Sequence, residues 1–446
     1  MPSSTAYAEF HHCMSRLADL DAALSLLNWD QEIMMPKGAG QRRAGQLATL
    51  AELRHQLYLN EVPPLLAALE HAQDLDEAQR LNVACTRADL AKQSRLPAEL
   101  VADLTRAASE GQFAWENAKD NDDFAAFAPF LEHLIDLKRR QADCYGYAST
   151  PYDALLDDYE RGLTVAQLDA YFDALEGELR QLLADVRQGQ PPEASFLRQA
   201  IDEDTQWQFT LDVLALLGFD PHHGRQDRSA HPFSTSMGME DVRITTRLEA
   251  DHLLDAVYST IHEFGHALYE RNLPPDAYGL PQGQAHSLAL HESQSRFWEN
   301  EVGRSLAFVQ WIEPRLRACF PDGLAGRSTE DIYRALNRVE TSLIRTQADE
   351  LTYNLHIILR YRLEKDLIEG RLAVRQLPEA WNAGMEQLLG VVPPDDRSGV
   401  LQDVHWSIGA LGYFPTYSLG SLYAAQWRAQ LESELGSLAD LISTGR

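Results

Sequence analysis

The chain has 446 residues, and its 67 acidic side chains outnumber its 39 basic ones, which gives a formal net charge of −28. A field of this sign repels nucleic-acid phosphates, so the composition argues against general binding of DNA or RNA. Apolar residues make up 45% of the chain. Because no stretch of about 18 apolar residues is free of charge and no signal sequence is visible, the sequence disfavours secretion and membrane spanning.

The four cysteines are widely separated and include no Cys-x-x-Cys pair. Neither a disulfide framework nor a thiolate metal site is therefore indicated. We predict a protein of the reducing cytoplasm.

Apolar residues recur mainly at helical spacing. Leucines at steps of three and four predict a helix that includes residues 17–27, and the same spacing runs from Ile332 to Leu343 behind a start at Ser328. Between them, residues 241–246 alternate apolar with polar side chains, which predicts a strand of a small β-sheet near the active site. The predicted breaks are short and are expected at residues 36–40, 189–192, 220–234, 274–283 and 393–399. We therefore predict a mainly α protein with one domain over residues 1–446.

The most informative segment is a His-Glu-x-x-His motif formed by His262, Glu263 and His266. It lies within residues 253–271, whose apolar spacing predicts one helix. Helical residues four apart are rotated by about 40° net, so both imidazoles can reach one metal ion at roughly 2.1 Å. Glu263 projects to one side of that pair, where a general base is needed for metal-assisted hydrolysis.

A catalytic zinc site needs a third protein ligand. Glu270 is excluded because its Cα lies about 12 Å from that of His262 along a straight helix. The polar cluster at residues 286–294 offers His286, His291 and Glu292. The last two point about 100° apart on a helix, so at most one of them faces the metal, and the spacing does not choose between them.

The motif at 262–266, followed by His291-Glu292-Ser293-Gln294, resembles the Taq-type carboxypeptidase family of zinc-dependent metallocarboxypeptidases. The amino-terminal segment Leu27-Asn28-Trp29-Asp30-Gln31 with Met35-Pro36 is also similar, so the resemblance covers nearly the whole chain. The other family motifs are His231-Pro232-Phe233, Asp241-x-Arg243-x-Thr245, Ile344-Arg345-x-x-Ala348-Asp349 and Gly399-x-x-Gln402-Asp403-x-His405-Trp406.

This resemblance implies that His262, His266 and Glu292 hold the metal and that Glu263 is the general base. It also implies a largely helical molecule with a long substrate cleft, found as a homodimer, and amino-terminal helices over about residues 1–80 as a lid. One Zn²⁺ per chain is expected, with Co²⁺ or Mn²⁺ as alternatives, because two imidazoles and a carboxylate accept each of them.

An enzyme that acts at the carboxyl end must bind a free α-carboxylate, and an arginine does this best through paired N–H donors. We favour Arg345 and then Arg397 for this role. A helix-surface ion pair with Asp349 is the structural alternative for Arg345. Arg243 shares a strand face with Asp241, which suggests a positioning pair.

Further candidates lie in or beside the motifs. His405, Tyr413 and Tyr417 are candidates to stabilise the oxyanion that forms during hydrolysis, although the tyrosines also suit a structural role. His231, which precedes a proline in a predicted loop, is a candidate for contact with the substrate or with a site residue, and so is Gln294 for the substrate.

Two other functions compete with the carboxypeptidase. A zinc endopeptidase or oligopeptidase would use the same metal residues in a cleft open at both ends. A non-catalytic, metal-stabilised peptide-binding protein would have no use for Glu263 as a base, because a purely structural zinc site closes its fourth position.

Overall fold

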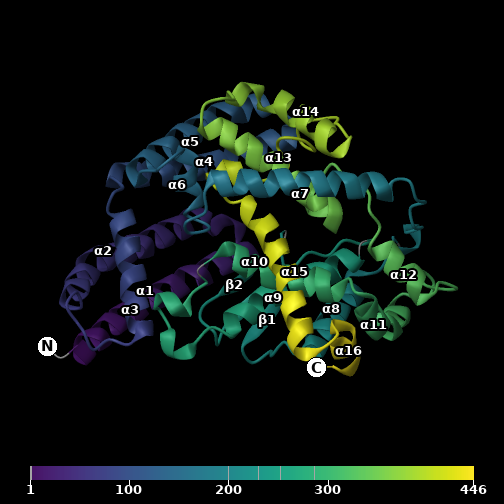
Figure 1. The fold of residues 1–446 in the computed structure, drawn as a ribbon, viewed down its shortest axis with the longest axis horizontal. Helices are drawn as coiled ribbons and strands as arrows, with labels where there is room; N and C mark the ends of the chain where they lie inside the picture. The colour runs from purple at the N-terminus through teal and green to yellow at the C-terminus, as the bar shows by residue number, and fades with distance from the viewer. Residues whose placement is uncertain (1–2, 199, 230, 252, 286, 446) are drawn as a thin grey trace.

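A computed structural model describes residues 3–198, 200–229, 231–251, 253–285 and 287–445 (Figure 1). The described part is mainly helical, with one small sheet. The helices up to the sheet are α1 (Ser3–Ile33), α2 (Gly40–Ala68), α3 (Glu77–Gln93), α4 (Ala98–Asn121), α5 (Phe124–Tyr145), α6 (Pro151–Leu156), α7 (Val165–Val186) and α8 (Glu203–Leu217). Those after it are α9 (Leu253–Arg271), α10 (Leu288–Arg296), α11 (Leu306–Cys319), α12 (Thr329–Leu336), α13 (Glu350–Ile368), α14 (Leu377–Leu389), α15 (Pro415–Leu435) and α16 (Leu438–Thr444).

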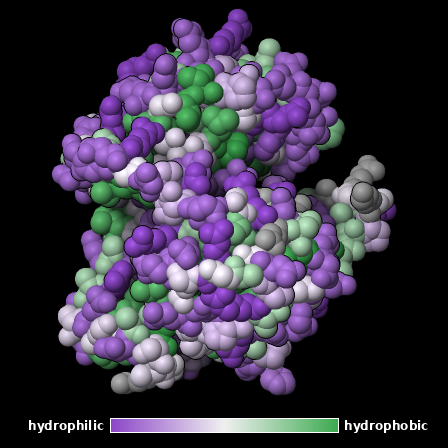
Figure 2. All heavy atoms as spheres, turned by 90° about the vertical axis from the view of Figure 1, so that its right-hand side faces the viewer, coloured by the Kyte–Doolittle hydropathy of each residue, from purple (hydrophilic) through white to green (hydrophobic). Residues whose placement is uncertain are grey.

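The helices form two lobes with separate cores. One core contains residues of α4, α5, α6, α7, α13 and α14. The other contains residues of α8, α9, α11, α12 and α16. Helix α15, yellow in Figure 1, runs from the first lobe to the second. Its Leu419 belongs to the first core, whereas Leu431 packs against the second. The face in Figure 2 is largely hydrophilic, as expected for a chain with a net charge of −28.

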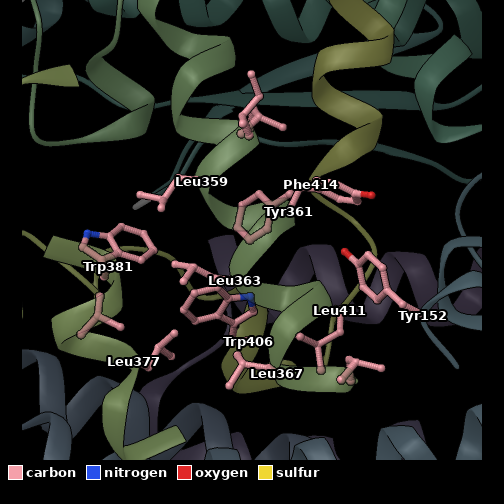
Figure 3. Close-up of a cluster of buried hydrophobic side chains, with 14 of the residues drawn as sticks. Tyr152, Leu359, Tyr361, Leu363, Leu367, Leu377, Trp381, Trp406, Leu411 and Phe414 are labelled. Atoms are coloured by element: carbon pink, nitrogen blue, oxygen red, sulfur yellow. The ribbon is translucent and has the colours of Figure 1, made fainter. Parts of the chain in front are cut away.

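The core of the first lobe holds the last family motif against α13. Figure 3 shows Trp381, Trp406 and Phe414 gathered around this helix. Glu364 of α13 accepts hydrogen bonds from the Tyr152 hydroxyl, from Trp406 Nε1 at 2.7 Å and from the Gly412 amide at 2.9 Å. The bonds from Trp406 and Gly412 attach the segment after His405 to the core, and the bond from Tyr152 ties α6 to the same carboxylate.

The sheet has the order β1-β3-β2. Strand β1 (Gly224–Arg228) is parallel to β3 (Val242–Thr246), and β2 (Ser234–Ser236) is antiparallel to it. Val242 and Ile244 of β3 pack against Phe264 of α9, which places the sheet directly beside the helix with the His-Glu-x-x-His motif. The predicted strand at 241–246 is confirmed.

The predicted break at 220–234 is wrong in part, because it contains β1. This strand has little apolar patterning of its own and depends on its pairing with β3. The two strands approach so closely that a Cβ on Gly224 would lie 2.4 Å from the carbonyl oxygen of Val242. Glycine is therefore needed at this position.

The helix predicted behind Ser328 begins as expected, but in the structure it is shorter than predicted. Ser328 caps α12 in a capping box with Asp331, and the helix stops at Leu336. Arg304 donates to the Leu336 carbonyl at 2.9 Å, and Asn337 donates to the Tyr333 carbonyl. Because Arg304, a tertiary partner, takes the Leu336 carbonyl, the helix stops there and the predicted extension to Leu343 is wrong. The helix over residues 17–27 is confirmed within α1.

The three amino-terminal helices have a core of their own, built around Phe10, Leu17 and Val62. Helix α1 reaches the sheet through Trp29, whose ring lies 4.5 Å from the guanidinium carbon of Arg243 and 5.1 Å from that of Arg225. None of the described helices is long and apolar enough to cross a bilayer.

Candidate active site

Helix α9 presents His262 and His266 on one side and buries the other. Ile261 and Phe264 are 0% and 2% exposed and pack into the second lobe and against the sheet. The two histidines are partly exposed, and the centroids of their rings lie 5.0 Å apart. The predicted helix at 253–271 is confirmed as Leu253–Arg271.

Glu292 of α10 faces both imidazoles. Its Oε2 atom lies 3.7 Å from His262 Nε2 and 3.4 Å from His266 Nε2. One atom from each of the three residues lies within 4.8 Å of the others. Donor atoms bound at about 2.1 Å to one cation must approach one another this closely, and two imidazoles with one carboxylate are a typical catalytic zinc set. These residues therefore fit a metal ion.

Two glycines allow α10 to lie this close to its neighbours. A Cβ on Gly265 of α9 would lie 2.5 Å from the Gln294 carbonyl oxygen and 2.6 Å from Ser295 Cα. A Cβ on Gly420 of α15 would lie 2.6 Å from Cγ of Glu292 itself. The position of Glu292 relative to the histidines thus depends on helix contacts that only glycine permits.

We expect Gly265→Ala to displace α10 from α9, because its new methyl group meets backbone atoms that cannot move independently. Overpacking of this kind costs about 1–3 kcal/mol of unfolding free energy. The variant should also bind Zn²⁺ more weakly in a chelator-competition titration. Gly177→Ala is the matched control, since Gly177 lies inside α7 and a Cβ added there would meet no other atom within 4 Å. Equal stability and metal affinity of both variants would contradict the proposed close contact.

Glu263 is buried beside the two histidines, with 6% of its surface exposed. Burial is the main reason that its pKa is raised to about 7, and a hydrogen bond from Ser234 of β2 acts in the opposite direction. Burial likewise lowers the pKa of His266 to about 4. Burial also disfavours the charged form of His262, but Glu292 and Glu299 outweigh it and raise its pKa to about 9.

Two residues that the sequence analysis missed contact the candidate ligands. Arg296 Nε donates to Glu292 Oε1 at 2.7 Å, and Glu299 Oε2 lies 2.8 Å from His262 Nδ1. The spacing of residues 292, 296 and 299, at steps of four and three, is the signal that could have identified them.

His291 is a neighbour of this cluster but is not one of the three residues whose ligand atoms converge. His291 Nε2 lies 2.8 Å from Glu270 Oε1, and the His291 ring stacks on that of His266 with centroids 4.5 Å apart. His286 lies outside the described residues. Of the alternatives that the spacing left open, the structure thus brings Glu292 to the histidine pair.

His405, Tyr413 and Tyr417 come together, and burial, together with the charge of Glu292, raises the pKa of both tyrosines. His405 Nε2 lies 3.2 Å from the Tyr417 hydroxyl, and the two tyrosine rings are 5.2 Å apart. Burial is the main cause that raises the pKa of Tyr413 to about 12, and Glu292 is the next. Burial together with Arg345 and Arg360 holds the pKa of His405 at about 3, so its imidazole is neutral at physiological pH.

Arg345 is buried in an ion-pair cluster. Its Nε and Nη2 atoms donate to Asp403 Oδ1 at 3.1 and 2.8 Å, and Nη1 donates to the Tyr353 hydroxyl. Arg360 donates to the other oxygen of Asp403 at 2.7 Å. Asp349, the alternative partner of Arg345, instead caps α13. With 6% of its surface exposed, Arg345 lies behind the Tyr417 ring, 5.0 Å from its centroid.

The remaining candidates lie in different surroundings. Arg243 is paired with Asp241 through two hydrogen bonds of 2.8 and 2.7 Å, as its position on the strand suggested. The exposed Arg397 donates to the carbonyls of Lys119 and Asp120 at the end of α4.

His231 and Gln294 are the last two candidates. His231 is exposed in the loop before β2, and partial burial is the main reason that its pKa is lowered. The Gln294 side-chain amide donates to the Ser293 hydroxyl at 3.1 Å, and the backbone carbonyl of Gln294 lies against Gly265.

Comparisons with known proteins identify the family. A profile described as Carboxypeptidase Taq (M32) metallopeptidase matches residues 9–446. Thermostable carboxypeptidase 1 of Thermus thermophilus is 42% identical over 452 residues, which cover 98% of this chain and 88% of that protein. Carboxypeptidase 1 of Bacillus subtilis is 36% identical, covering 100% of this chain and 89% of its own. A crystal structure of an M32 carboxypeptidase from Deinococcus radiodurans superimposes with a TM-score of 0.95 at 39% identity, covering 98% of this chain and 89% of the other. The chain therefore belongs to the Taq (M32) carboxypeptidase family of metallopeptidases.

Proposed function

We propose that this metallocarboxypeptidase holds one Zn²⁺ with His262, His266 and Glu292 and uses Glu263 as the general base. The convergence of the three ligand atoms within 4.8 Å of one another carries this proposal. The position of Glu263 next to the first ligand, in a buried environment, supports its role as base. A bound ion of this kind supplies Lewis acidity that activates water and polarises the peptide carbonyl.

The residues of the chain then handle the protons and the developing charge. The Glu263 carboxylate accepts a proton from the attacking water and returns it to the leaving amine. Burial raises the pKa of the Glu263 carboxyl, and the Ser234 side chain of β2 lowers that pKa and so favours the form that accepts a proton. The Tyr413 and Tyr417 hydroxyls are donors for the oxyanion, and neutral His405 holds the hydroxyl of Tyr417 at 3.2 Å.

Recognition of the terminal carboxylate rests on the charge of the cluster behind Tyr417. Arg345 and Arg360 carry two positive charges against the single negative charge of Asp403, and the three side chains are at most 12% exposed. The unbalanced positive charge attracts an α-carboxylate placed at the tyrosines. Arg345 thus attracts the substrate carboxylate through its charge and does not bind it directly. Further contacts with the peptide are assigned to Arg243, His231, Gln294 and Arg397.

The decisive experiment compares matched peptides with a free and an amidated carboxyl terminus. We expect release of the last amino acid from the free acid and little cleavage of the amide, because the amide lacks the charge that the cluster attracts. Mass analysis of the products and kcat/KM for each peptide measure this. Equal rates for both peptides, or internal cleavage, would instead indicate an endopeptidase. Binding without any cleavage would indicate a non-catalytic protein.

The proposal has four further parts. Co²⁺ and Mn²⁺ suit the same donor set and are alternatives to Zn²⁺. The four cysteines are free thiols, which agrees with a cytoplasmic location. The homodimer and the lid function of about residues 1–80 rest on the family resemblance, and the contact of Trp29 with the sheet gives such a lid an attachment near Ser234.

A further inference from the structure

The helix that carries Glu292 changes its form directly after Arg296. There α10 ends and a π-helical segment, η5 (Phe297–Gly303), continues the chain. π-Helical turns are rare in proteins and are frequently found at functional sites. Glu292, Arg296 and Glu299 lie in one group across this change of helical form, and their side chains are only 7%, 12% and 15% exposed.

Arg296 engages one of the two oxygens of Glu292. Oε1 accepts the 2.7 Å hydrogen bond from Arg296 Nε, whereas Oε2 faces the Nε2 atoms of His262 and His266. The guanidinium itself is held over the Tyr353 ring, with its carbon atom 4.2 Å from the ring centroid. A cation bound by the two histidines therefore meets Oε2 of Glu292, whose protein donor is the Ser295 hydroxyl at 3.2 Å, and not Oε1, which Arg296 engages.

Glu299 engages the opposite nitrogen of His262. When Nδ1 donates its proton to Glu299 Oε2 at 2.8 Å, the lone pair of the imidazole is on Nε2, which faces Glu292. Arg296 Nη1 and Arg304 Nη2 lie 3.4 and 3.6 Å from Glu299 oxygens and hold that carboxylate in place. Within the described part of the chain, His266 Nδ1 has no hydrogen-bond partner.

We propose that Arg296 and Glu299 are positioning residues of the metal site. Arg296 restricts Glu292 to binding through one oxygen, which leaves room in the coordination shell for substrate and water. Glu299 fixes the tautomer and ring orientation of His262. Arg296 also separates the two carboxylates, which would repel each other without it. This inference rests on the proposed ligand set of His262, His266 and Glu292.

Glu299→Gln tests the proposed role of Glu299, with Glu270→Gln as a matched control. In both pairs a carboxylate oxygen lies 2.8 Å from an imidazole nitrogen, but His291, the partner of Glu270, is outside the proposed ligand set. We expect the Kd for Zn²⁺, measured by competition with a chelator, to rise about 10–100-fold for Glu299→Gln. It should not change measurably for Glu270→Gln.

Arg296→Met tests the proposed role of Arg296 through the visible spectrum of the Co²⁺-loaded protein. Freeing the second oxygen of Glu292 should convert a four-coordinate ion to a five-coordinate one, which absorbs more weakly. Arg296→Lys restores a cationic donor and should recover part of the absorption. If Arg296→Met does not fold, the double variant R296M/E299Q, which removes one charge of each sign, is compared with Glu299→Gln in the same way.

The possible outcomes distinguish a failure of the roles of Arg296 and Glu299 from a failure of the proposed ligand set. A wild-type protein that binds neither Zn²⁺ nor Co²⁺ would overturn the ligand set and the inference together. If the wild type binds both ions, equal Kd values for Glu299→Gln and Glu270→Gln would overturn the role of Glu299 alone. An unchanged cobalt spectrum in the variants lacking the Arg296 side chain would overturn the role of Arg296.

Discussion

Glu263→Gln should retain the metal and lose nearly all peptidase activity. The amide has almost the same shape as the carboxylate but cannot accept the proton of the attacking water. General bases contribute about 10²–10⁴-fold to enzymatic rates, and we expect a loss in kcat near the upper end because the site is buried. Metal content by elemental analysis and kcat with a free-acid peptide measure the two effects separately.

Glu330→Gln is the control for this substitution. Glu330 lies exposed on α12 in an ion pair with Arg334, so its neutralisation should leave both metal content and kcat unchanged. If Glu263→Gln keeps substantial activity with a full complement of metal, the base is another residue. If it loses the metal, the residue acts in metal binding.

Asp403→Asn should cause the largest loss of stability among these substitutions. Asp403 is the only carboxylate that directly pairs Arg345 and Arg360 in the described structure, and both arginines are buried. Removing one partner of a buried ion pair typically costs about 3–5 kcal/mol, because an uncompensated charge remains. Denaturant unfolding measures this, and Asp173→Asn serves as the control. That residue is 73% exposed in its pair with Arg362, so a cost below about 1 kcal/mol is expected.

The loss of unfolding free energy in Asp403→Asn depends on pH in a way that follows from the direction of the pKa shift of Asp403. Burial by itself would raise the pKa of Asp403, but Arg345 and Arg360 outweigh it and hold the pKa well below its usual value. The stabilisation is therefore fully present above the unfolded-state pKa of about 3.9 and is lost only as the pH falls below it. The difference in unfolding free energy between the wild-type and Asp403→Asn proteins should be the same at about pH 7 and about pH 5. A difference that shrinks over this interval would contradict the lowered pKa.

Local sequence patterns predicted the helix with the metal motif and the strand beside it. The apolar periodicity of residues 253–271 and the alternation at 241–246 are properties of single segments, and the structure has α9 and β3 at these places. The predicted mainly α fold, the family and the metallocarboxypeptidase class are confirmed by the comparisons. Helix geometry also correctly separated Glu270 from the histidine pair, since Glu270 instead contacts His291.

Patterns in single segments did not predict contacts between distant ones. The strand β1 exists through its pairing with β3, and α12 ends where Arg304 takes a carbonyl. Arg345 was expected to bind a carboxylate of the substrate or of Asp349. The alternative with Asp349 is wrong, because Arg345 pairs with Asp403, which is 58 residues away, and its role toward the substrate stays a prediction.

The sequence by itself determined that two histidines and a glutamate share one turn of a helix, because the geometry of an α-helix depends only on neighbouring residues. Only the tertiary structure brought one residue of the cluster at 286–294, Glu292, to the pair and showed what holds it there. Glu292 reaches the pair because glycines at 265 and 420 allow helices to meet, and Arg296 and Glu299 contact Glu292 and His262 from the end of α10 and from the π-helical segment that follows it. Close packing and buried charge pairs depend on all surrounding segments at once, and no single segment contains that information.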